Sequence, residues 1–398
     1  MKIAIFSDNF YPELSGIADS IISLARCLAK RGHEVLFCAP RYSRKNYRLV
    51  NRPPGEPALG ERVRVRRFAS LPYPGPTGQS RLVLPTGLRW LWLKGFKPDL
   101  IHTQLFFGVG LEALVAARRL KVPLVGTSHT PMAEFVKYSP VRSPRVEKLV
   151  ERYVNWYYGK CDFVTAPSQP ILDEMKAGGF TGVCRALSNP IELESFSPAG
   201  PEQKAVLKKK LGLGDQVIFY AGRLAEEKRL EVILRAIALV KERNPLVVFV
   251  IAGLGDGRGK LEALAAELNL KNNIRFFGFL PARELVELYR ASDVFSVTST
   301  AETQCLSMMN AMACGLPVIG VRARALPEFI NSENGFLIEV DDHRALAEKI
   351  NLLLGDQPLR EKLGRGGTEF VKRFAADHIA EEWEKIYTET ISAQRSKI

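Results

Sequence analysis

The chain has 398 residues, of which 46% are hydrophobic and 25% charged, and its formal net charge is +13 at pH 7. This composition excludes an intrinsically disordered chain, and the length predicts two domains. No apolar run reaches the roughly 18 residues that a bilayer-spanning helix needs. The positive charge leaves nucleic acid, an anionic membrane surface and anionic small ligands as candidate partners.

The N-terminal segment and the cysteines indicate a compartment. Met1 to Asp8 has the pattern of a short strand ending in polar residues rather than of a signal peptide. The six cysteines, at positions 27, 38, 161, 184, 305 and 314, include no Cys-x-x-Cys pair and no metal-ligand cluster. Reduced thiols in a cytoplasmic protein are therefore expected.

Short β-rich apolar runs alternate with amphipathic stretches, which predicts a parallel α/β fold. In the first half the expected strands are Ile3–Ser7, Glu34–Ala39, Leu100–Thr103, Leu124–Ser128 and Phe163–Ala166. In the second half they are Val217–Ala221, Val247–Ala252, Ile274–Phe277, Val294–Val297, Val318–Gly320 and Phe336–Ile338. The series restarts near residue 217 with a strand–Gly–helix opening like that of residues 2 to 20. Two similar Rossmann-like halves are therefore expected.

Two features of the first half suit a ligand site. Gly16 precedes a helix expected from Asp19 to Arg31, where backbone N–H groups could approach a phosphate. A plain surface turn remains an alternative. His129, in Ser128-His129-Thr130, follows a strand end and could face a cleft, or it could be a packed or solvated histidine.

The middle and the end of the chain set the domain boundaries. Residues 188–201 are rich in Pro and in residues that favour turns, which indicates a linker. Residues 1–188 would form one domain and 202–370 a second. The tail, residues 371–398, would form a helix, because Phe370, Ile379, Trp383 and Tyr387 have helical spacing.

A Gly, an Arg and a Lys follow the first strand of the second half. Gly222, Arg223 and Lys228 directly succeed Val217–Tyr220, and the two cations could take up charge that develops on a leaving diphosphate. The alternative is a solvated basic helix start, since acidic residues crowd the same turn. No Asp-x-Asp stands at a strand end, so we expect no metal and no other cofactor.

Farther along, Glu302-Thr-Gln-Cys-Leu-Ser-Met-Met-Asn310 is predicted to open a helix that Gly315 and Pro317 close. Eight residues of helix separate Glu302 from Asn310 by about 12 Å. A hydrolase pair of carboxylates stands roughly 5 to 9.5 Å apart. The spacing suits two ends of one long ligand, such as a nucleotide-sugar. The alternative is that Glu302 is only an acid favoured by the helix dipole.

This block resembles the motif of retaining glycosyltransferases of family 4, which have the GT-B fold: two Rossmann-like domains with parallel sheets facing across a cleft. The resemblance implies that Glu302, His129, Arg223 and Lys228 carry catalysis, with no enzyme nucleophile. It implies as well that the helix of the tail crosses back to the first domain. It also implies a donor site made of Gly16, Gly253, Arg275, Phe277, Thr303, Gln304, Cys305, Leu306 and Asn310. Asn310 stands where the family has a second Glu, and Cys305 where a small residue is usual.

Basic residues and aromatics concentrate in the first half, which selects the acceptor in GT-B enzymes. They occur in Arg41 to Arg52, Arg62 to Arg67, Arg89 to Lys97 and a helix expected from Arg142 to Lys160. Such segments suit an anionic membrane surface. Core packing of the tryptophans, with solvated arginines, is the alternative. Glu302-Thr-Gln and His129-Thr resemble lipid glycosyltransferases such as monoglucosyldiacylglycerol synthases.

The sequence therefore predicts a glucosyltransferase that uses UDP-glucose and a lipid such as diacylglycerol. It would be cytoplasmic, peripherally attached to the inner face of the membrane, with no nucleic acid and no obligate protein partner. GDP-mannose as donor or a soluble acceptor remains an alternative. So do a nucleotide-sugar epimerase and a non-catalytic GT-B binder.

Overall fold

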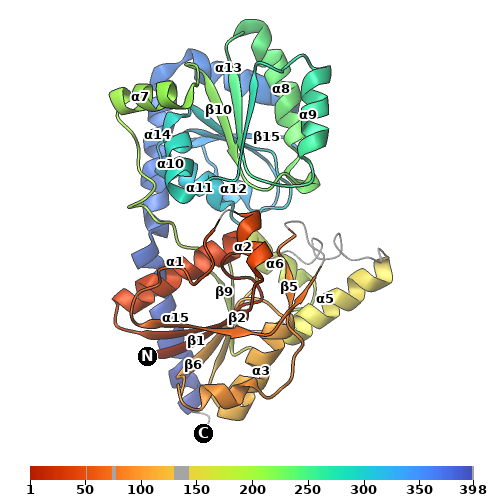
Figure 1. Cartoon of the computed structure of the whole chain (residues 1–398), viewed down its shortest axis with the longest axis vertical. Coiled ribbons are helices and arrows are strands. Elements are labelled where there is room, and N and C mark those ends of the chain that lie inside the picture. The colour runs from red at the N-terminus through yellow and green to blue at the C-terminus, as the bar shows by residue number, and fades with distance from the viewer. Residues whose placement is uncertain (51, 74–77, 130–142, 397–398) are drawn as a thin grey trace. The chain divides into compact units, whose positions relative to one another are not determined.

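The computed structural model describes residues 1–50, 52–73, 78–129 and 143–396. The chain divides into two compact units (Figure 1). Unit 1 comprises Met1–Pro190 and Ala376–Ile398, and unit 2 comprises Ile191–Ala375. The sequence analysis predicted domains at residues 1–188 and 202–370 and a separate tail at residues 371–398. Thr130 and Arg142, which entered the sequence analysis, lie outside the described residues.

Unit 1 is built on a seven-stranded parallel sheet with the order β3-β2-β1-β6-β7-β8-β9. Its strands are β1 Lys2–Phe6, β2 Glu34–Pro40, β3 Val63–Phe68, β6 Leu100–Thr103, β7 Leu124–Thr127, β8 Phe163–Ala166 and β9 Cys184–Ala186. Two short strands, β4 Leu71–Pro72 and β5 Arg81–Leu82, pair antiparallel. Both unpredicted strands of the sheet, β3 and β9, are edge strands, whose partial exposure weakens the apolar signal.

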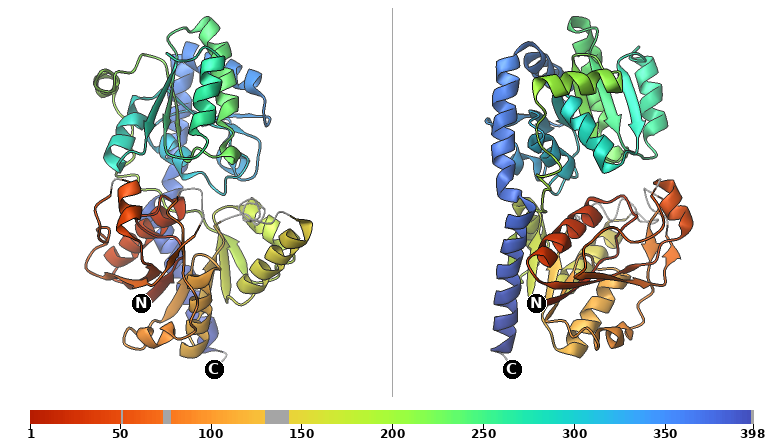
Figure 2. Two further views of the ribbon diagram at one scale, coloured as in Figure 1. Left: turned by 45° about the vertical axis from the view of Figure 1, so that its right-hand side comes forward. Right: turned by 60° about the vertical axis from the view of Figure 1, so that its left-hand side comes forward.

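Helices lie on both faces of this sheet, with α1 and α3 on opposite sides (Figure 2). They are α1 Gly16–Lys30, α2 Arg44–Leu49, α3 Gly108–Leu120, α5 Pro144–Tyr158, α6 Gln169–Ala177 and α15 Ala376–Arg395, with a 3-10 turn η1 at Arg89–Leu93. The last helix, α15, packs against α1. Unit 1 is therefore completed by a segment that follows unit 2 in the chain.

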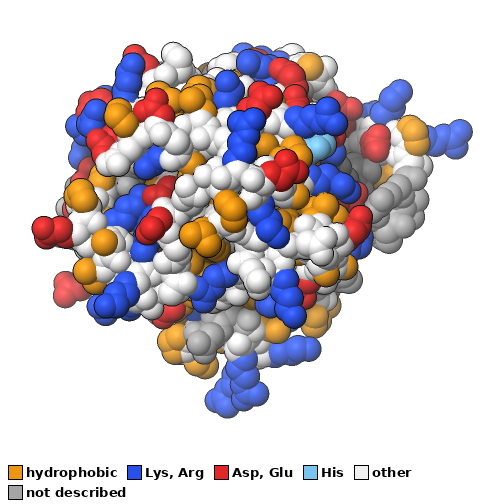
Figure 3. Space-filling model, turned by 90° about the horizontal axis from the view of Figure 1, so that it is seen from above, with side chains coloured by type: hydrophobic (Ala, Val, Ile, Leu, Met, Phe, Trp, Pro, Cys, Tyr) orange, Lys and Arg blue, Asp and Glu red, His pale blue; other side chains and the backbone are white. Residues whose placement is uncertain are grey.

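The surface carries charges of both signs. On the face drawn in Figure 3, Lys and Arg side chains lie among Asp and Glu side chains, so the net positive charge forms no continuous field there. Within the described ranges, no helix is both long enough and apolar enough to cross a membrane.

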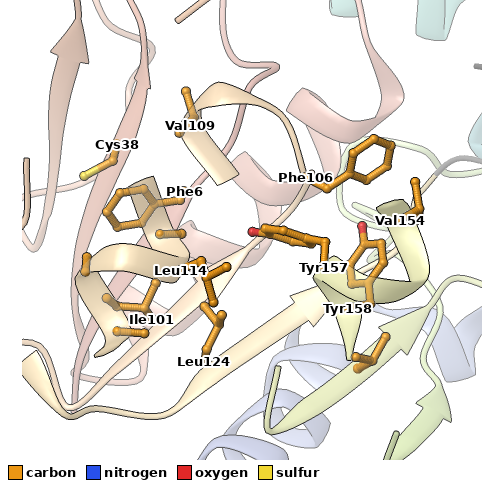
Figure 4. Packing of buried hydrophobic residues seen from close by; sticks show 14 of the residues in the cluster. Phe6, Cys38, Ile101, Phe106, Val109, Leu114, Leu124, Val154, Tyr157 and Tyr158 are labelled. Atoms are coloured by element: carbon orange, nitrogen blue, oxygen red, sulfur yellow. The ribbon is translucent and has the colours of Figure 1, made fainter. Parts of the chain in front are cut away.

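The core of unit 1 lies between the sheet and α3, α5 and η1. Figure 4 shows Phe6 and Ile101 from the two central strands near Leu114, with Tyr157 and Tyr158 of α5 turned inward. Tyr157 is fully buried and its hydroxyl donates to the Gly110 carbonyl oxygen at 2.8 Å. Buried tyrosines need such a partner, because an unsatisfied hydroxyl in the core is costly.

Unit 2 has a six-stranded parallel sheet with the order β12-β11-β10-β13-β14-β15. Its strands are β10 Val217–Ala221, β11 Val248–Ala252, β12 Ile274–Gly278, β13 Val294–Val297, β14 Val318–Val321 and β15 Gly335–Ile338. All six were predicted to within a residue or two. Strand order reverses between β10 and β13, which is the place where ligands bind in open α/β sheets.

The helices of unit 2 connect these strands. They are α7 Pro201–Leu211, α8 Leu230–Arg243, α9 Arg258–Glu267, α10 Ala282–Ala291, α11 Leu306–Ala313, α12 Leu326–Phe329, α13 His343–Gly355 and α14 Gln357–Val371, with 3-10 turns η2 Glu226–Lys228 and η3 Lys372–Phe374. With parallel strands joined by helices in both units, the predicted α/β fold class with two Rossmann-like domains is confirmed.

Two predicted helices begin later in the chain than the sequence analysis expected. The helix after β13 begins at Leu306, because Cys305 at its N-cap has a left-handed backbone with φ +67°. Glu302 therefore lies in the preceding loop, and the 12 Å helical spacing to Asn310 does not apply. The tail contains the expected helix, α15, but this helix begins at Ala376: Phe370 belongs to α14, which ends at Val371, and η3 separates the two helices.

Candidate active site

The candidate site lies in unit 2, at the carboxyl ends of β10 and β13. The turn after β10 is held by its neighbours: Gly222 N donates to the Ala252 carbonyl oxygen and Leu224 N to that of Leu254, both at 2.9 Å. The Tyr220 hydroxyl donates to the Arg223 carbonyl oxygen at 3.0 Å. Arg223 is thus fixed directly beside the point where strand order reverses.

The glycines after β11 have a packing role. A Cβ atom on Gly253 would lie 1.8 Å from the Gly222 carbonyl oxygen, and one on Gly255 would lie 2.2 Å from that of Leu224. Gly253 also has φ +149° and donates its N–H to the Gly278 carbonyl oxygen at 2.7 Å. Glycine is required here so that two loops can touch, independently of any phosphate.

Lys228 is the last residue of η2, and the next residue, Arg229, has φ +50°. The Thr298 hydroxyl, just after β13, lies 3.0 Å from the Lys228 carbonyl oxygen and 2.9 Å from that of Arg229. Thr298 therefore clamps the backbone that carries Lys228. Sequence reasoning missed this residue, although its position one residue past a central strand was a signal.

Lys228 and Glu302 form an ion pair, with Nζ 2.6 Å from Oε1. Their side chains are only 14% and 13% exposed. Burial lowers the pKa of Lys228, but the Glu302 carboxylate outweighs it and the net pKa is raised. Burial raises the pKa of Glu302, while Lys228, the Ser299 hydroxyl and Arg223 lower it, so the net pKa is lowered. Both groups are charged at neutral pH, and Lys228 is not part of a solvated helix start.

Arg223 pairs with Glu227, with 2.8 Å between Nη2 and Oε1. The guanidinium side chain is 36% exposed, whereas that of Glu227 is 6% exposed. Thr300 N donates to the Glu227 carbonyl oxygen at 3.3 Å, which ties this turn to the loop after β13. Two cations and Glu302 thus meet at one edge of the sheet. In the sequence analysis, Glu227 counted only among the acidic residues of this turn, with no role of its own.

The rest of the Glu302 block leads into α11. Thr303 is half-buried in the loop, Gln304 is buried, and Cys305 caps the helix before Leu306. Burial first, and Glu302 second, raise the pKa of Cys305 to about 12, so its thiol is neutral. Asn310 is half-buried on α11.

One expected donor residue, Arg275, lies apart from this cluster by its contacts. The Arg275 guanidinium donates to the carbonyl oxygens of Leu211 and Gly212, at the amino end of the sheet. It also lies 5.5 Å from the Phe277 ring centroid. Because the active edge is the carboxyl end, the structure does not bring the Arg275 side chain to Lys228 and Glu302.

His129 and Gly16 belong to unit 1. Gly16 is the exposed first residue of α1, and the Ser15 side chain caps this helix by accepting from Ile17 N. His129 is 6% exposed, and its Nε2 lies 2.6 Å from Gln104 Oε1. Burial lowers the pKa of His129 to about 3, so the ring is neutral. Gln104 was not singled out in the sequence.

No group of three or more His, Cys, Asp and Glu side chains in the described part of the chain has the arrangement of a metal site.

Comparison with known proteins gives consistent matches. A family model for glycosyl transferases group 1 matches residues 203–370, and one for glycosyltransferase family 4 matches residues 14–195. The α-monoglucosyldiacylglycerol synthase of Streptococcus pneumoniae is 30% identical over 80% of this chain and 70% of its own length. A GDP-mannose-dependent α-mannosyltransferase of Mycobacterium tuberculosis is 28% identical over 86% of this chain and 85% of its own.

Among solved structures, the Anabaena protein Alr3699/HepE in complex with UDP and glucose superposes with a TM-score of 0.77. It is 19% identical, and the match covers 98% of this chain and 100% of that protein. This likeness supports the fold. From the two family models and the Streptococcus relative, the chain belongs to the group 1 and family 4 glycosyltransferases and is a glycosyltransferase.

Proposed function

We propose that this enzyme transfers a hexose, glucose from UDP-glucose, to a lipid acceptor such as diacylglycerol, with retention of configuration. The observation that carries the proposal is the buried Lys228–Glu302 pair beside Arg223, where the unit 2 sheet reverses its strand order. Lys228 and Arg223 would bind the diphosphate, and Glu302 would accept hydrogen bonds from the sugar hydroxyls.

In this reaction the bond between the sugar C1 and the diphosphate oxygen breaks, and the acceptor oxygen bonds to C1 on the same face. The acceptor proton passes to the departing phosphate oxygen. Negative charge grows on the diphosphate as the bond breaks. Two fixed cations at one sheet edge stabilise that charge without reorganising, which is the largest effect that a protein site offers. We propose that no metal ion is needed.

An exposed helix face supports a membrane-bound acceptor. On α5, residues at spacings of three, four, seven and eleven share one side and are exposed: Arg145, Lys148, Leu149, Arg152 and Trp156. Leu149 is 66% exposed and Trp156 45%. A face that alternates cations with large apolar side chains fits anionic headgroups and the acyl boundary beneath them.

A second segment of unit 1 has the same character. Leu88 is 62% exposed and Trp92 49%, so Trp92 is not a core residue. The Arg66 guanidinium lies 4.6 Å from the Trp92 ring centroid, and Lys94 Nζ lies 4.8 Å from that of Trp90. Stacked cations next to exposed leucines suit an interface between water and lipid.

The test is turnover with a panel of nucleotide-sugars against diacylglycerol, phosphatidylinositol and a soluble sugar, with and without anionic vesicles. Glucosyldiacylglycerol formed from UDP-glucose, and faster on anionic vesicles, is the expected result. Product from the soluble sugar alone would contradict the lipid acceptor. GDP-mannose is the second donor candidate, because one relative at similar identity is GDP-mannose-dependent. Incubation with donor alone also tests the epimerase alternative.

A further inference from the structure

A chain of buried polar side chains runs through unit 1 from its last helix to His129. Tyr387 Oη of α15 lies 2.8 Å from His102 Nδ1. His102 Nε2 lies 3.0 Å from Gln104 Nε2, and Gln104 Oε1 lies 2.6 Å from His129 Nε2. All four side chains are at most 6% exposed. The Trp383 ring of α15 also packs on the His102 ring, with 4.4 Å between centroids.

Both histidines are neutral. Burial lowers the pKa of each ring to about 3, and for His102 the neighbouring His129 adds to the effect. A neutral imidazole has one N–H donor and one acceptor nitrogen. The position of the proton on each ring is therefore fixed by what its neighbours can donate or accept.

The amide of Gln104 decides both tautomers. Its oxygen can only accept, so His129 Nε2 carries the proton and His129 Nδ1 keeps its lone pair. Its nitrogen can only donate, so His102 Nε2 accepts and His102 Nδ1–H donates to the Tyr387 oxygen. The Thr127 hydroxyl, 2.7 Å from His102 Nε2 and 2.8 Å from Thr165 Oγ1, is consistent with this pattern because it can donate to the ring.

We propose that Tyr387, His102 and Gln104 are positioning residues that hold His129 as its Nε2–H tautomer, so that Nδ1 can accept a hydrogen bond from a hydroxyl of a substrate. The part that concerns the substrate rests on the proposed function. The network borders a small pocket, which is lined by His102, Gln104, Thr127 and His129 with Ser20 and Asn189 among others, so it is not sealed inside the core.

The bonds leave one competing arrangement. If the Gln104 amide were rotated, every proton would reverse: Tyr387 would donate to His102 Nδ1, His102 Nε2–H to Gln104, and Gln104 to His129 Nε2. His129 would then carry its proton on Nδ1. Tyr387→Phe removes the acceptor of His102 Nδ1–H in the first arrangement. A buried donor without a partner is the costlier defect, so this variant should shift the network to the reversed state.

The test is nitrogen-15 NMR of the full-length enzyme labelled at histidine, which distinguishes the two tautomers, with His129→Gln to identify the His129 signals. We expect Nε2–H at His129 in the parent enzyme and a shift toward Nδ1–H in Tyr387→Phe. Tyr157→Phe is the matched control, because it removes another buried hydroxyl of unit 1 outside the network. It should leave both tautomers unchanged. Nδ1–H at His129 in the parent enzyme, or an unchanged His129 tautomer in Tyr387→Phe, overturns the proposal that these residues position His129.

Kinetics test the second half of the proposal. Loss of one hydrogen bond to the substrate should lower kcat/KM roughly 3- to 10-fold in Tyr387→Phe. A reversed tautomer with unaltered kcat/KM overturns the role of Nδ1. Absence of turnover with every donor, in an enzyme whose tautomers are as expected, would instead count against the proposed function.

Discussion

Lys228 and Glu302 depend on each other for their charge. Each is largely buried, so removing one leaves the other without its counter-ion in a poorly hydrated place. The same pair would bind diphosphate and sugar in the proposed function. Substitutions at this pair should therefore be read with a stability measurement beside the rate.

Lys228→Met and Glu302→Ala are each expected to abolish transfer, because the first removes a cation from the leaving group and the second an acceptor for the sugar. Lys228→Met should also lower the free energy of unfolding by about 3 kcal/mol. Lys210→Met is the control, since Lys210 pairs with Glu287 on the surface at 57% exposure. Near-normal transfer in Lys228→Met would show that the reaction occurs elsewhere.

Lys228→Met and the parent enzyme should differ in their free energy of unfolding, and the directions of the pKa shifts of Glu302 and Lys228 determine how this difference depends on pH. The pKa of Glu302 in the folded state is lowered from 4.5, so its stabilising effect is complete above pH 4.5 and is lost as pH falls through the folded value. The pKa of Lys228 is raised from 10.5, so its effect is complete below pH 10.5. Urea unfolding of Lys228→Met and parent enzyme should give a constant difference between pH 5.5 and 9.5. A difference that disappears at pH 6 would contradict the assignment.

Asn310 is one of the residues at which this chain departs from the motif that it resembles. Asn310→Glu restores a carboxylate, and a charged acceptor binds a hydroxyl more strongly than an amide does. The expected result is a KM for the nucleotide-sugar lowered roughly 3- to 10-fold, with kcat little changed. Asn310→Asp tests whether reach matters as well as charge. An unchanged donor KM in both variants would separate Asn310 from the donor.

At the scale of elements, the loop after β11 packs directly on the turn after β10, because the glycines of this loop have no side chains to keep the two backbones apart. Gly253→Ala would force a Cβ into the Gly222 carbonyl oxygen at a backbone angle that L-residues avoid. We expect a loss of about 3 kcal/mol in the free energy of unfolding, with a fall in transfer, because Arg223 is carried by the displaced turn. Gly259→Ala in α9 is the control. It meets no atom within 4 Å, so it should stabilise by about 0.5 kcal/mol.

If the exposed face of α5 contacts the membrane, its cations should contribute to the binding of anionic vesicles. Each cation near an anionic surface contributes about 1 kcal/mol. Reversing Arg145, Lys148 and Arg152 to Glu should therefore weaken sedimentation with phosphatidylglycerol vesicles by at least 100-fold, while transfer to detergent-dispersed lipid persists.

The matched control for α5 has the same change in net charge in unit 2, at the exposed residues Lys209, Lys260 and Lys271. Equal loss of vesicle binding in both triple variants would mean that overall charge, not this helix face, drives attachment.

The elements also explain what the sequence could predict. Central strands such as β10 and β13 were found because both faces are buried and the sequence is continuously apolar. Strand β3 was read as a basic stretch, although its alternation of valine with arginine was a period-2 signal. The true start of α11 was hidden, because nothing in the sequence requires a left-handed backbone at Cys305. The partners of His102 were hidden as well, since Tyr387 lies 285 residues away in the chain.

For the whole enzyme, we expect no dependence on divalent metal, because in the proposed reaction Arg223 and Lys228 would supply the positive charge that the leaving diphosphate needs. Transfer after dialysis against a chelator should stay within about twofold of the untreated rate. A loss restored by added Mg²⁺ would show that the two cations do not suffice.

Because α15 belongs to unit 1 yet follows unit 2 in the chain, protein synthesis must delay the completion of unit 1. The strands of its sheet leave the ribosome first, while the helix that covers His102 emerges after all of unit 2. A nascent chain therefore holds an uncovered imidazole and apolar α1 side chains throughout translation of some 185 intervening residues, Ile191–Ala375. During that interval the exposed apolar side chains favour the binding of chaperones. Termination of translation there would yield a fragment whose unit 1 lacks its last helix.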